Sequence, residues 1–545
     1  MQLKEARAKG GLMVVLLLQF ACACVLARDV HITILHTCDL HGNVLPTENY
    51  EGRTNLGGLA RCATVIRQVR AQEKNVLLVD AGDTIQGAPV GYLTDGQVMV
   101  KALNELHYDA WVWGNHEFDW GMEKLAACAE RARMPILNAN LQACSPNSFT
   151  ADVVARLLAH RQDCIIREVD GVKVGIIGLN TPGIPNWTRP RLIEGVKFAD
   201  SVETLRRLVP TLRQAGAQVL VLVCHQGYRE TGDDQANHVN AIARDFPELD
   251  VIIGAHSHRD FPEFKVGNAL YCQADFFGIH LGRVDLVFDT VQGRVKRSTS
   301  NTMLMDERVP LDGALVKSLG KELDLAQKTL ATGIGEARGD FGLEGAPRRE
   351  TPIHDLIFEA IAEALQIRGV KVDAIVHGIL EQRATIRKGS ITIGDVWRVV
   401  PYENTIGVVQ LTPAQLKDIL EENASAYERR DFRGIWGVMC GVDPEAKEGM
   451  RIVSMQGADG GVLRADRKLA VAFNSFDLAS GGLRWKRLRG IADSPGAELV
   501  EYDLQTRQAV IDYVRRHGEV SPVVKGWWRT MRQRAASSAA IASGH

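Results

Sequence analysis

The sequence predicts an α/β protein with a four-layer α/β/β/α amino-terminal domain, followed by a smaller α+β domain. From Asp29 to about Met305, short apolar runs alternate with segments of helical character. Buried strands read as short apolar runs, and their alternation with helices is typical of α/β folds. A second series of helical and strand-like segments follows a charged, glycine-rich interruption. A chain of 545 residues is long enough for two or three domains of about 100–200 residues each.

Five apolar runs are the expected strands of the first domain, and three periodic segments between them are expected helices. The strands are His31–Leu35, Val76–Val79, Ala110–Trp113, Val219–Val223 and Val251–Ile253. The helices are Leu59–Ala71, Glu123–Arg133 and Val202–Ala215.

Composition shifts divide the chain into a first domain at 28–310, a connecting helix and linker at 311–349, and a second domain at 350–530. Leu311–Leu330 is charged, helix-periodic and free of proline, whereas Thr332–Arg349 is rich in glycine and charge and is predicted to be a linker. The second domain is expected to open with the helix Ile353–Leu365. The small-residue tail at 531–545 is predicted to be disordered.

The amino terminus has the pattern of a secretory signal peptide at 1–27. Three basic residues precede the apolar run Gly11–Leu18, and the small-residue stretch Ala21–Ala27 follows it. The apolar core is shorter than the about 20 residues that a membrane anchor needs. We therefore expect an exported protein, periplasmic or extracellular, without a transmembrane segment in its mature chain.

Bulk charge and cysteine spacing exclude several classes of protein. The formal net charge of -2 gives no global field that would attract a nucleic acid polymer or an anionic membrane. The eight cysteines beyond the signal are too sparse for a disulfide scaffold and lack metal-finger spacing, although Cys144 and Cys164 could pair across one loop-like stretch. A small-molecule partner is expected instead.

Polar side chains of metal-ligand type directly follow each of the five expected strands. Ligand-type residues at the carboxyl ends of such strands converge on one crevice. A mixed set of carboxylate, amide and imidazole ligands suits Zn, Mn, Fe or Co, and a carboxylate can bridge two cations. The sequence therefore predicts a site for two divalent metal ions. Its candidate ligands are Asp39, His41, Asp83, Asn115, His225, His256 and His258.

Four of these clusters resemble the phosphoesterase motifs of the calcineurin-like metallophosphoesterases, and more closely those of the 5′-nucleotidase family in its secreted, bifunctional bacterial form. The matching segments are Ile34–Asn43, Val79–Thr84, Gly114–Asp119 and Gly254–His258. The resemblance implies that one ion is held by Asp39, His41, Asp83 and His258. It implies that the other is held by Asp83, Asn115, His225 and His256.

The resemblance also implies that His116 is the catalytic histidine and that Asp119 orients it. Coordination lowers the pKa of a water toward about 7, which provides a hydroxide that attacks phosphorus. His116 would stabilise charge on the phosphoryl oxygens and on the leaving group. Asp119, three residues further on, would fix the imidazole tautomer and favour its protonated form.

The second domain resembles the carboxy-terminal specificity domain of the same family, with two departures. Tyr402 and Phe476 stand where the family sandwiches a base, and Arg383 matches its phosphate-contacting arginine. Gly378–Gln382 replaces an Asn-Gly-Gly-Gly-Ile-like stretch, and Leu483 replaces an aspartate that bonds ribose hydroxyls. These departures affect the choice of substrate and leave the reaction class intact.

The expected function is therefore metal-dependent hydrolysis of phosphate monoesters, with nucleotides as the first substrate class. Within the same chemistry, the alternatives are a cyclic nucleotide, a UDP-sugar or a thiosulfate-type ester. A non-catalytic protein that binds metal and ligand is the alternative from another class, and the pairing of His116 with Asp119 argues against it.

Overall fold

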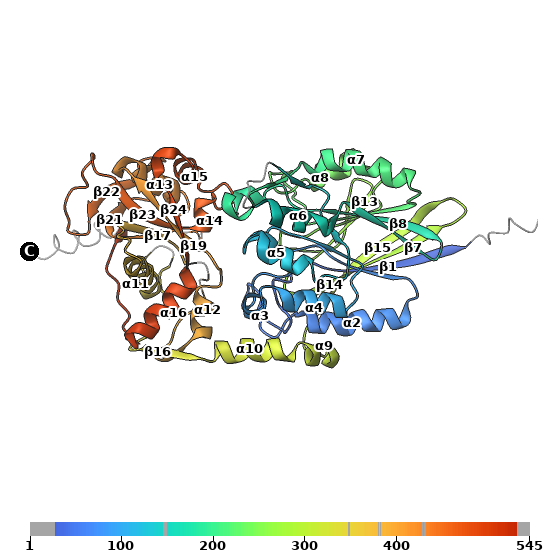
Figure 1. Ribbon diagram of the computed structural model, residues 1–545, viewed down its shortest axis with the longest axis horizontal. Helices are drawn as coiled ribbons and strands as arrows, with labels where there is room; N and C mark the ends of the chain where they lie inside the picture. Colours follow the sequence, from blue (N-terminus) through green and yellow to red (C-terminus); the bar gives the residue numbers. More distant parts are fainter. Residues whose placement is uncertain are drawn as a thin grey trace, which may run out of the picture.

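The computed structural model describes residues 28–144, 150–346, 349–379, 381, 383–427, 429 and 432–530. Two domains lie side by side along the long axis of the molecule, and a helical segment runs between them along one edge (Figure 1). The predicted signal peptide at 1–27 and the predicted disordered tail at 531–545 lie outside the described residues. Within the described ranges, no helix has both the length and the apolarity needed to cross a membrane.

The first domain contains two large sheets. The seven-stranded sheet has the order β15-β14-β1-β2-β3-β4-β6, in which β1, β2, β3, β4 and β6 run parallel and β14 and β15 form an antiparallel edge. Its strands are β1 (Asp29–Thr37), β2 (Val76–Asp80), β3 (Ala110–Val112), β4 (Ile136–Leu137), β6 (Arg161–Gln162), β14 (His280–Asp289) and β15 (Arg294–Leu304).

The six-stranded sheet has the order β12-β13-β11-β10-β8-β7, with parallel central strands and an antiparallel strand at each edge. Its strands are β7 (Cys164–Val169), β8 (Val172–Leu179), β10 (Val219–Cys224), β11 (Val251–Ile253), β12 (Asp260–Val266) and β13 (Ala269–Ala274).

Alternation of side chains along the strands builds four layers. In β10, Val221 and Val223 face a core shared with Ile32 and Ile34 of β1, so the two sheets pack face to face. Leu222 points the other way, into a core with the helix α7. Helices therefore cover both outer faces, and the predicted α/β/β/α arrangement is confirmed. The covering helices are α2 (Leu59–Gln72), α4 (Gln97–Glu105), α5 (Met122–Ala129) and α6 (Ala151–Ala159) on one side, and α7 (Ser201–Gln214) and α8 (Val239–Asp245) on the other.

The connection between the domains differs from the prediction. The expected single helix is divided into α9 (Gly313–Ser318) and α10 (Gly320–Leu330). The stretch 332–349 was expected to be a linker, but it contains the strand β16 (Gly333–Ala337), which pairs with β18 (Gly389–Thr392) and β25 (Glu519–Val520). Ile334 and Ala337 are buried in the second domain. The glycines of β16 hid its strand character, because only two side chains of this strand, Ile334 and Ala337, enter the core.

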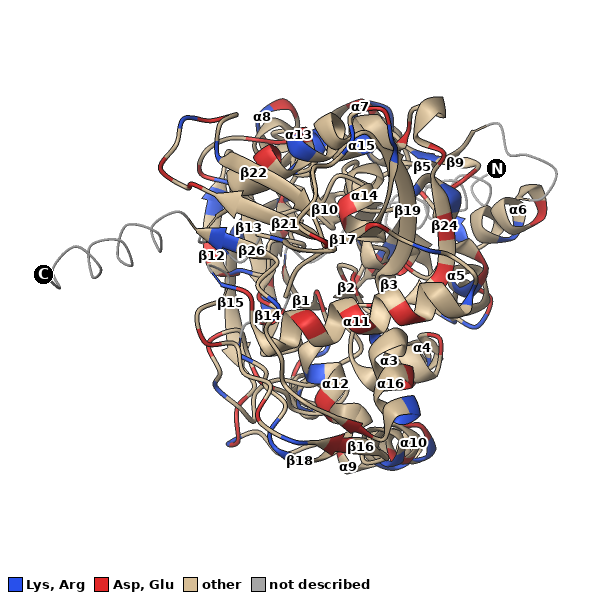
Figure 2. Ribbon diagram, turned by 90° about the vertical axis from the view of Figure 1, so that its left-hand side faces the viewer, with Lys and Arg blue, Asp and Glu red and all other residues tan. Residues whose placement is uncertain are grey.

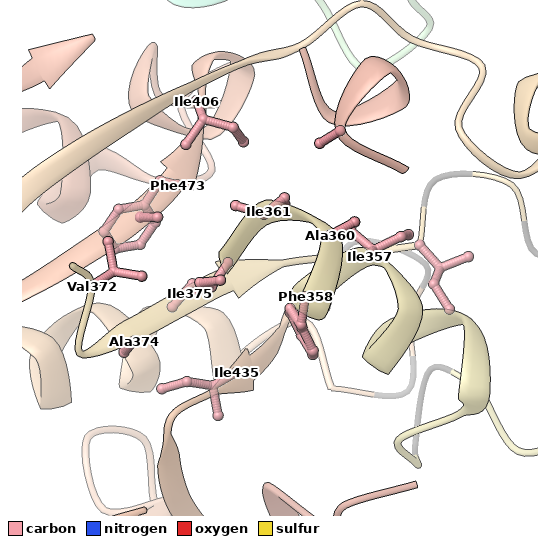
Figure 3. Packing of buried hydrophobic residues seen from close by; sticks show 14 of the residues in the cluster. Ile357, Phe358, Ala360, Ile361, Val372, Ala374, Ile375, Ile406, Ile435 and Phe473 are labelled. Carbon is pink, nitrogen blue, oxygen red and sulfur yellow. The ribbon is translucent and has the colours of Figure 1, made fainter. Parts of the chain in front are cut away.

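The second domain is α+β, as predicted. Its main sheet has the order β20-β17-β23-β19-β24, and a three-stranded sheet has the order β22-β21-β26. Figure 3 shows side chains of α11, among them Phe358 and Ile361, gathered with Ile375 of β17 and Ile435 of β20 in one core. The strands are β17 (Ala374–His377), β19 (Thr405–Leu411), β20 (Gly434–Trp436), β21 (Val438–Val442), β22 (Ile452–Gly457), β23 (Leu469–Asn474), β24 (Val500–Gln505) and β26 (Trp528–Thr530). The helices are α11 (Pro352–Ile367), α12 (Ile393–Val399), α13 (Pro413–Ala424), α14 (Ser475–Leu478), α15 (Lys486–Ala492) and α16 (Thr506–His517).

Basic and acidic residues are interspersed over both domains and do not segregate by sign (Figure 2), as the small net charge leads one to expect. The described cysteines are all free thiols, so the disulfide considered for Cys144 and Cys164 is not formed.

Candidate metal centre and substrate cavity

The candidate ligands meet because both sheets end at the same edge. In the first sheet, Asp39, Asp83 and Asn115 follow the carboxyl ends of the parallel neighbours β1, β2 and β3. In the second sheet, His225 and His256 follow the parallel neighbours β10 and β11. Carboxyl ends of parallel strands are the usual place for a ligand crevice, and here two sheets contribute to one crevice.

The loops at this edge need an unusual backbone. Five of the seven candidate ligands have positive φ angles: Asp39, His41, Asp83, His256 and His258. At Gly82 (φ +98°), a Cβ would lie 2.5 Å from the backbone nitrogen of Gly114 and 2.9 Å from Nδ1 of His225. Only glycine allows the loops to approach so closely.

The first cluster consists of Asp39, His41 and His258. Nε2 of His258 lies 3.4 Å from Oδ1 of Asp39 and 3.1 Å from Nε2 of His41. The other ring nitrogen of His41, Nδ1, donates to the carbonyl oxygen of Gln86 at 3.1 Å, which directs its Nε2 into the cluster. The cluster thus offers one carboxylate and two imidazole nitrogens to a single point.

The second cluster consists of Asp83, His225 and His256. Nε2 of His225 lies 3.0 Å from Oδ2 of Asp83, and Nδ1 of His225 donates to the carbonyl oxygen of Ala81 at 2.8 Å. Oδ2 of Asp83 also lies 3.9 Å from Nε2 of His41 in the first cluster. Asp83 therefore stands between the clusters, where a bridging carboxylate would stand.

The chemistry of these groups fits divalent ions. Oδ1 of Asn115 is buried and makes no hydrogen bond within the described part of the chain, which is costly unless another partner binds it. Burial lowers the pKa of His41 and of His256 to about 3, so both imidazoles are neutral, the form that binds metals. The described residues thus present the unpaired oxygen of Asn115 and the neutral imidazoles of His41 and His256 at one place.

His116 is joined to Asp119 beside these clusters. Nδ1 of His116 lies 2.6 Å from Oδ2 of Asp119, across one turn of the short 3-10 helix η1 (His116–Phe118). Burial alone would lower the pKa of His116, but the carboxylates of Asp119 and Asp83 outweigh it and raise the pKa to about 10. The pair therefore favours a protonated imidazole. Ligand atoms of His116, His41 and Asp83 also lie close enough together to contact one ion.

Two carboxyl groups at the centre were missed by sequence reasoning. Glu117 is buried and accepts backbone N–H groups from the loops that carry Asp83 and Asn115. Asp80 is buried at the end of β2, where its Oδ2 accepts from Thr37 at 2.6 Å. Burial raises the pKa of each to about 7. The one signal in the sequence was the position of Glu117 in the Gly-Asn-His-Glu segment. A carboxylate that is buried beside a candidate metal ligand needs hydrogen-bond donors around it.

A cavity of about 720 Å³ lies between the two domains and includes part of the metal-ligand cluster. The first domain contributes predicted ligands and the His116–Asp119 pair to its lining, and the second contributes the predicted base-stacking aromatics. The sequence-predicted residues that line it are Asn115, His116, Asp119, His256, Tyr402 and Phe476. The guanidinium of Arg484 lies 5.6 Å from the ring centroid of Phe476 and lines the same cavity.

Arg383 is not brought to this cavity. Its guanidinium lies 3.2 Å from Glu48 of the first domain and 3.2 Å from Glu381. Leu483 also lies away from the lining, while its neighbour Arg484 reaches it. Gly378 packs against Arg433, whose buried guanidinium pairs with Asp477 at 2.9 Å. This arginine–aspartate pair thus lies beside Gly378, the first residue of the stretch that departs from the family pattern.

Comparison with known proteins agrees with this architecture. The calcineurin-like phosphoesterase family matches residues 32–260, and the 5′-nucleotidase C-terminal domain family matches residues 333–489. The chain is 28% identical to a snake venom 5′-nucleotidase of Gloydius brevicauda, over 92% of this chain and 89% of the relative. It is 27% identical to a 2′,3′-cyclic-nucleotide 2′-phosphodiesterase/3′-nucleotidase of Salmonella typhimurium, over 76% of this chain and 72% of the relative.

Among solved structures, a 5′-nucleotidase precursor from Thermus thermophilus superposes with a TM-score of 0.70 at 27% identity, covering 92% of this chain and 99% of that one. The four-layer domain and its cluster of ligand side chains define a metal-dependent phosphoesterase. The chain thus combines a calcineurin-like phosphoesterase domain with a 5′-nucleotidase C-terminal domain.

Proposed function

We propose that the protein hydrolyses the phosphate ester of nucleotides, with two divalent ions at the metal centre. One observation carries the proposal: a single cavity is lined by His116, Asn115 and His256 from the first domain and by Tyr402 and Phe476 from the second. A nucleotide has a phosphate at one end and a flat base at the other, so it matches a cavity with ligand side chains in one wall and aromatic rings in the other.

The first ion would be held by Asp39, His41, Asp83 and His258, and the second by Asp83, Asn115, His225 and His256. When bound, such ions lower the pKa of a water and offset charge on the phosphoryl oxygens. Zn, Mn, Co and Fe all suit this mixture of nitrogen and oxygen ligands. Asp83 stands between the two clusters, which supports its role as the bridging ligand.

His116 acts as the proton donor in this proposal. Its Nδ1 is engaged by Asp119, which leaves Nε2 as the atom that faces a substrate in the cavity. The raised pKa keeps a proton on that nitrogen, and the proton passes to the leaving oxygen as the ester bond breaks. Asp119 stabilises the cationic ring and fixes its orientation.

Tyr402 and Phe476 hold the base, and Arg484 beside Phe476 supplies a cation in the same wall. The relatives named above are a 5′-nucleotidase and a cyclic-nucleotide phosphodiesterase/3′-nucleotidase, so nucleotides are the substrate class to test first. Arg383 would need to leave Glu48 to contact a phosphate in this cavity.

A hydrolysis screen tests the proposal. The purified protein is stripped of metal, reloaded separately with Zn, Mn, Co or Mg, and offered nucleoside 5′-, 3′- and 2′,3′-cyclic phosphates beside an aryl phosphate. We expect phosphate release from at least one nucleotide, lost on chelation and restored by metal. Release from the aryl phosphate alone would contradict the nucleotide assignment, and no release from any ester would contradict hydrolysis.

We also propose that the protein is exported, because a basic segment, a short apolar run and small residues follow one another at 1–27. Amino-terminal sequencing of the protein recovered outside the cytoplasm checks this. A chain that keeps residues 1–27 and stays in the cytoplasm would contradict it.

A further inference from the structure

Gln86 connects the metal centre to the second domain. It is 3% exposed and lies between β2 and the short helix α3 (Pro89–Leu93). Its backbone carbonyl accepts from Nδ1 of the candidate ligand His41 at 3.1 Å. Its side-chain amide donates to Oε2 of Glu403, in the second domain, at 2.7 Å. One residue thus contacts a candidate metal ligand through its backbone and the opposite domain through its side chain.

Glu403 is held firmly from its own side. Its Oε1 accepts from Arg507 at 2.8 Å, and both side chains are less than 5% exposed. Arg507 also donates to the carbonyl oxygens of Val400 and Pro401 and lies 3.5 Å from the ring centroid of Trp397. The loop that carries Glu403 is therefore fixed within the second domain. A buried, charge-assisted contact of this kind is strong and directional.

The loop fixed in this way carries the predicted base-stacking residue. Tyr402 directly precedes Glu403, and both line the cavity together with Gln86. The Gln86–Glu403 hydrogen bond therefore spans the boundary between the domains inside the cavity wall. Tyr92 makes another hydrogen bond between the domains, to Gln505 at 2.8 Å, but neither of these residues lines the cavity.

We propose that Gln86 and Glu403 are a positioning pair that sets the separation between the metal centre and Tyr402. The pair then determines specificity for substrates that contact both domains, and has little effect on esters too small to do so. This inference rests on the proposed nucleotide hydrolysis. It names the two residues whose contact sets the length of the cavity, so that a nucleotide fits between the metal centre and Tyr402.

An exchange of the two side chains tests the pair. Gln86→Glu alone places two carboxylates together, Glu403→Gln alone leaves a weaker hydrogen bond between two neutral amides, and the double variant again pairs one amide donor with one carboxylate. Loss of a hydrogen bond to a charged group corresponds to about a ten- to hundredfold change. We expect Gln86→Glu to raise KM for the nucleotide by about that factor, Glu403→Gln to raise it less, and the double variant to recover part of the loss that Gln86→Glu causes.

Readouts other than nucleotide turnover separate positioning from general damage. Hydrolysis of p-nitrophenyl phosphate should change by less than about threefold in all three variants, because a small ester needs no contact with Tyr402. Calorimetric titration of the metal-free protein with Mn should give the same stoichiometry as for the wild type. Tyr92→Phe is the matched control, since it removes a hydrogen bond between the domains outside the cavity and should leave KM unchanged.

Equal losses on the nucleotide and on p-nitrophenyl phosphate would overturn the inference, and so would a double variant that recovers nothing. Failure of the proposed function looks different, because the wild type itself would then cleave p-nitrophenyl phosphate and no nucleotide.

Discussion

Oε2 of Glu117 accepts the backbone N–H of Asp83 at 2.9 Å, and the same oxygen accepts the N–H of Gly114 at 2.6 Å. Its other carboxylate oxygen accepts from Thr84 and Ile85. One buried side chain thus ties the loop of the bridging candidate Asp83 to the loop of Asn115. Neither loop belongs to regular secondary structure, so this carboxylate accepts backbone N–H groups that a neighbouring strand would accept in a sheet.

Glu117→Gln should weaken both the fold and the binding of metal, because the amide has one acceptor oxygen where the carboxylate has two. Loss of hydrogen bonds to a charged group lowers the free energy of unfolding by about 1.5–3 kcal/mol. Denaturant unfolding and metal titration of the metal-free protein measure the two effects. Glu123→Gln, at an exposed ion pair with Arg156, is the control and should change stability by less than about 0.5 kcal/mol. Equal behaviour of the two variants would contradict the role of Glu117.

His116→Ala should lower kcat by about 10²–10⁴ if the imidazole donates the proton to the leaving group. The metal content, measured by elemental analysis, should stay at the wild-type value, because the candidate ligands are untouched. An unchanged kcat would exclude the proton-donor role, and a loss of metal together with activity would make His116 a ligand instead.

Asp119→Asn should move the alkaline limb of the pH–kcat profile to lower pH. Burial lowers the pKa of His116 and the carboxylate of Asp119 raises it, so its removal lowers the pKa. A proton donor is active while protonated, and its activity falls as pH rises through its pKa. A variant whose alkaline limb coincides with that of the wild type would show that Asp119 does not act through His116.

Tyr402→Ala and Phe476→Ala should each raise KM for a nucleotide while leaving hydrolysis of an aryl phosphate nearly unchanged. Stacking of a base on an aromatic side chain contributes about 1–3 kcal/mol, or roughly five- to 150-fold in KM. Steady-state kinetics on both substrates measures the difference. Parallel losses on the two substrates would indicate that the rings only pack within the second domain.

Asp355→Asn should stabilise the protein at alkaline pH. Burial and the neighbouring carboxylate of Glu350 raise the pKa of Asp355 to about 8, above the value of the unfolded chain. The retained proton therefore stabilises the fold fully below about pH 4, and this contribution is lost as pH rises through 8. An asparagine supplies an N–H that does not titrate.

Denaturant unfolding at pH 5 and pH 9 checks this: the variant should exceed the wild type at pH 9, and the difference should shrink at pH 5. Asp466→Asn, at an exposed ion pair with Arg464, should show no such trend. A constant difference across the two pH values would rule out a proton retained by Asp355.

The sequence was sufficient to predict the four layers and the place where the candidate ligands gather. Apolar runs marked β1, β2, β3, β10 and β11, and parallel strands carry whatever follows them to one edge. That inference needs only local pattern and the geometry of a parallel sheet. The assignment of ions to individual ligands remains part of the proposal.

Contacts between segments that are distant along the chain could not be predicted from the sequence. The amide of Gln86 meets Glu403 more than 300 positions away, and no local pattern announces such a pair. Arg383 aligned with a phosphate-binding arginine, yet it lies beside Glu48, because the orientation of the domains decides which carboxylate it meets. The strand β16 was hidden by its glycines and became visible only through its partners β18 and β25.

The backbone of the metal centre has a further consequence. A non-glycine residue with a left-handed backbone costs about 1–2 kcal/mol, although Asp and His bear it better than most residues do. Asp39, His41, Asp83, His256 and His258 all adopt it. Glycine at any of these positions would relieve this backbone strain, so five side chains of metal-ligand type stand here at a cost in backbone energy. Their presence marks this edge of the sheets as a place where the fold is less stable than it could be because the side chains serve chemistry.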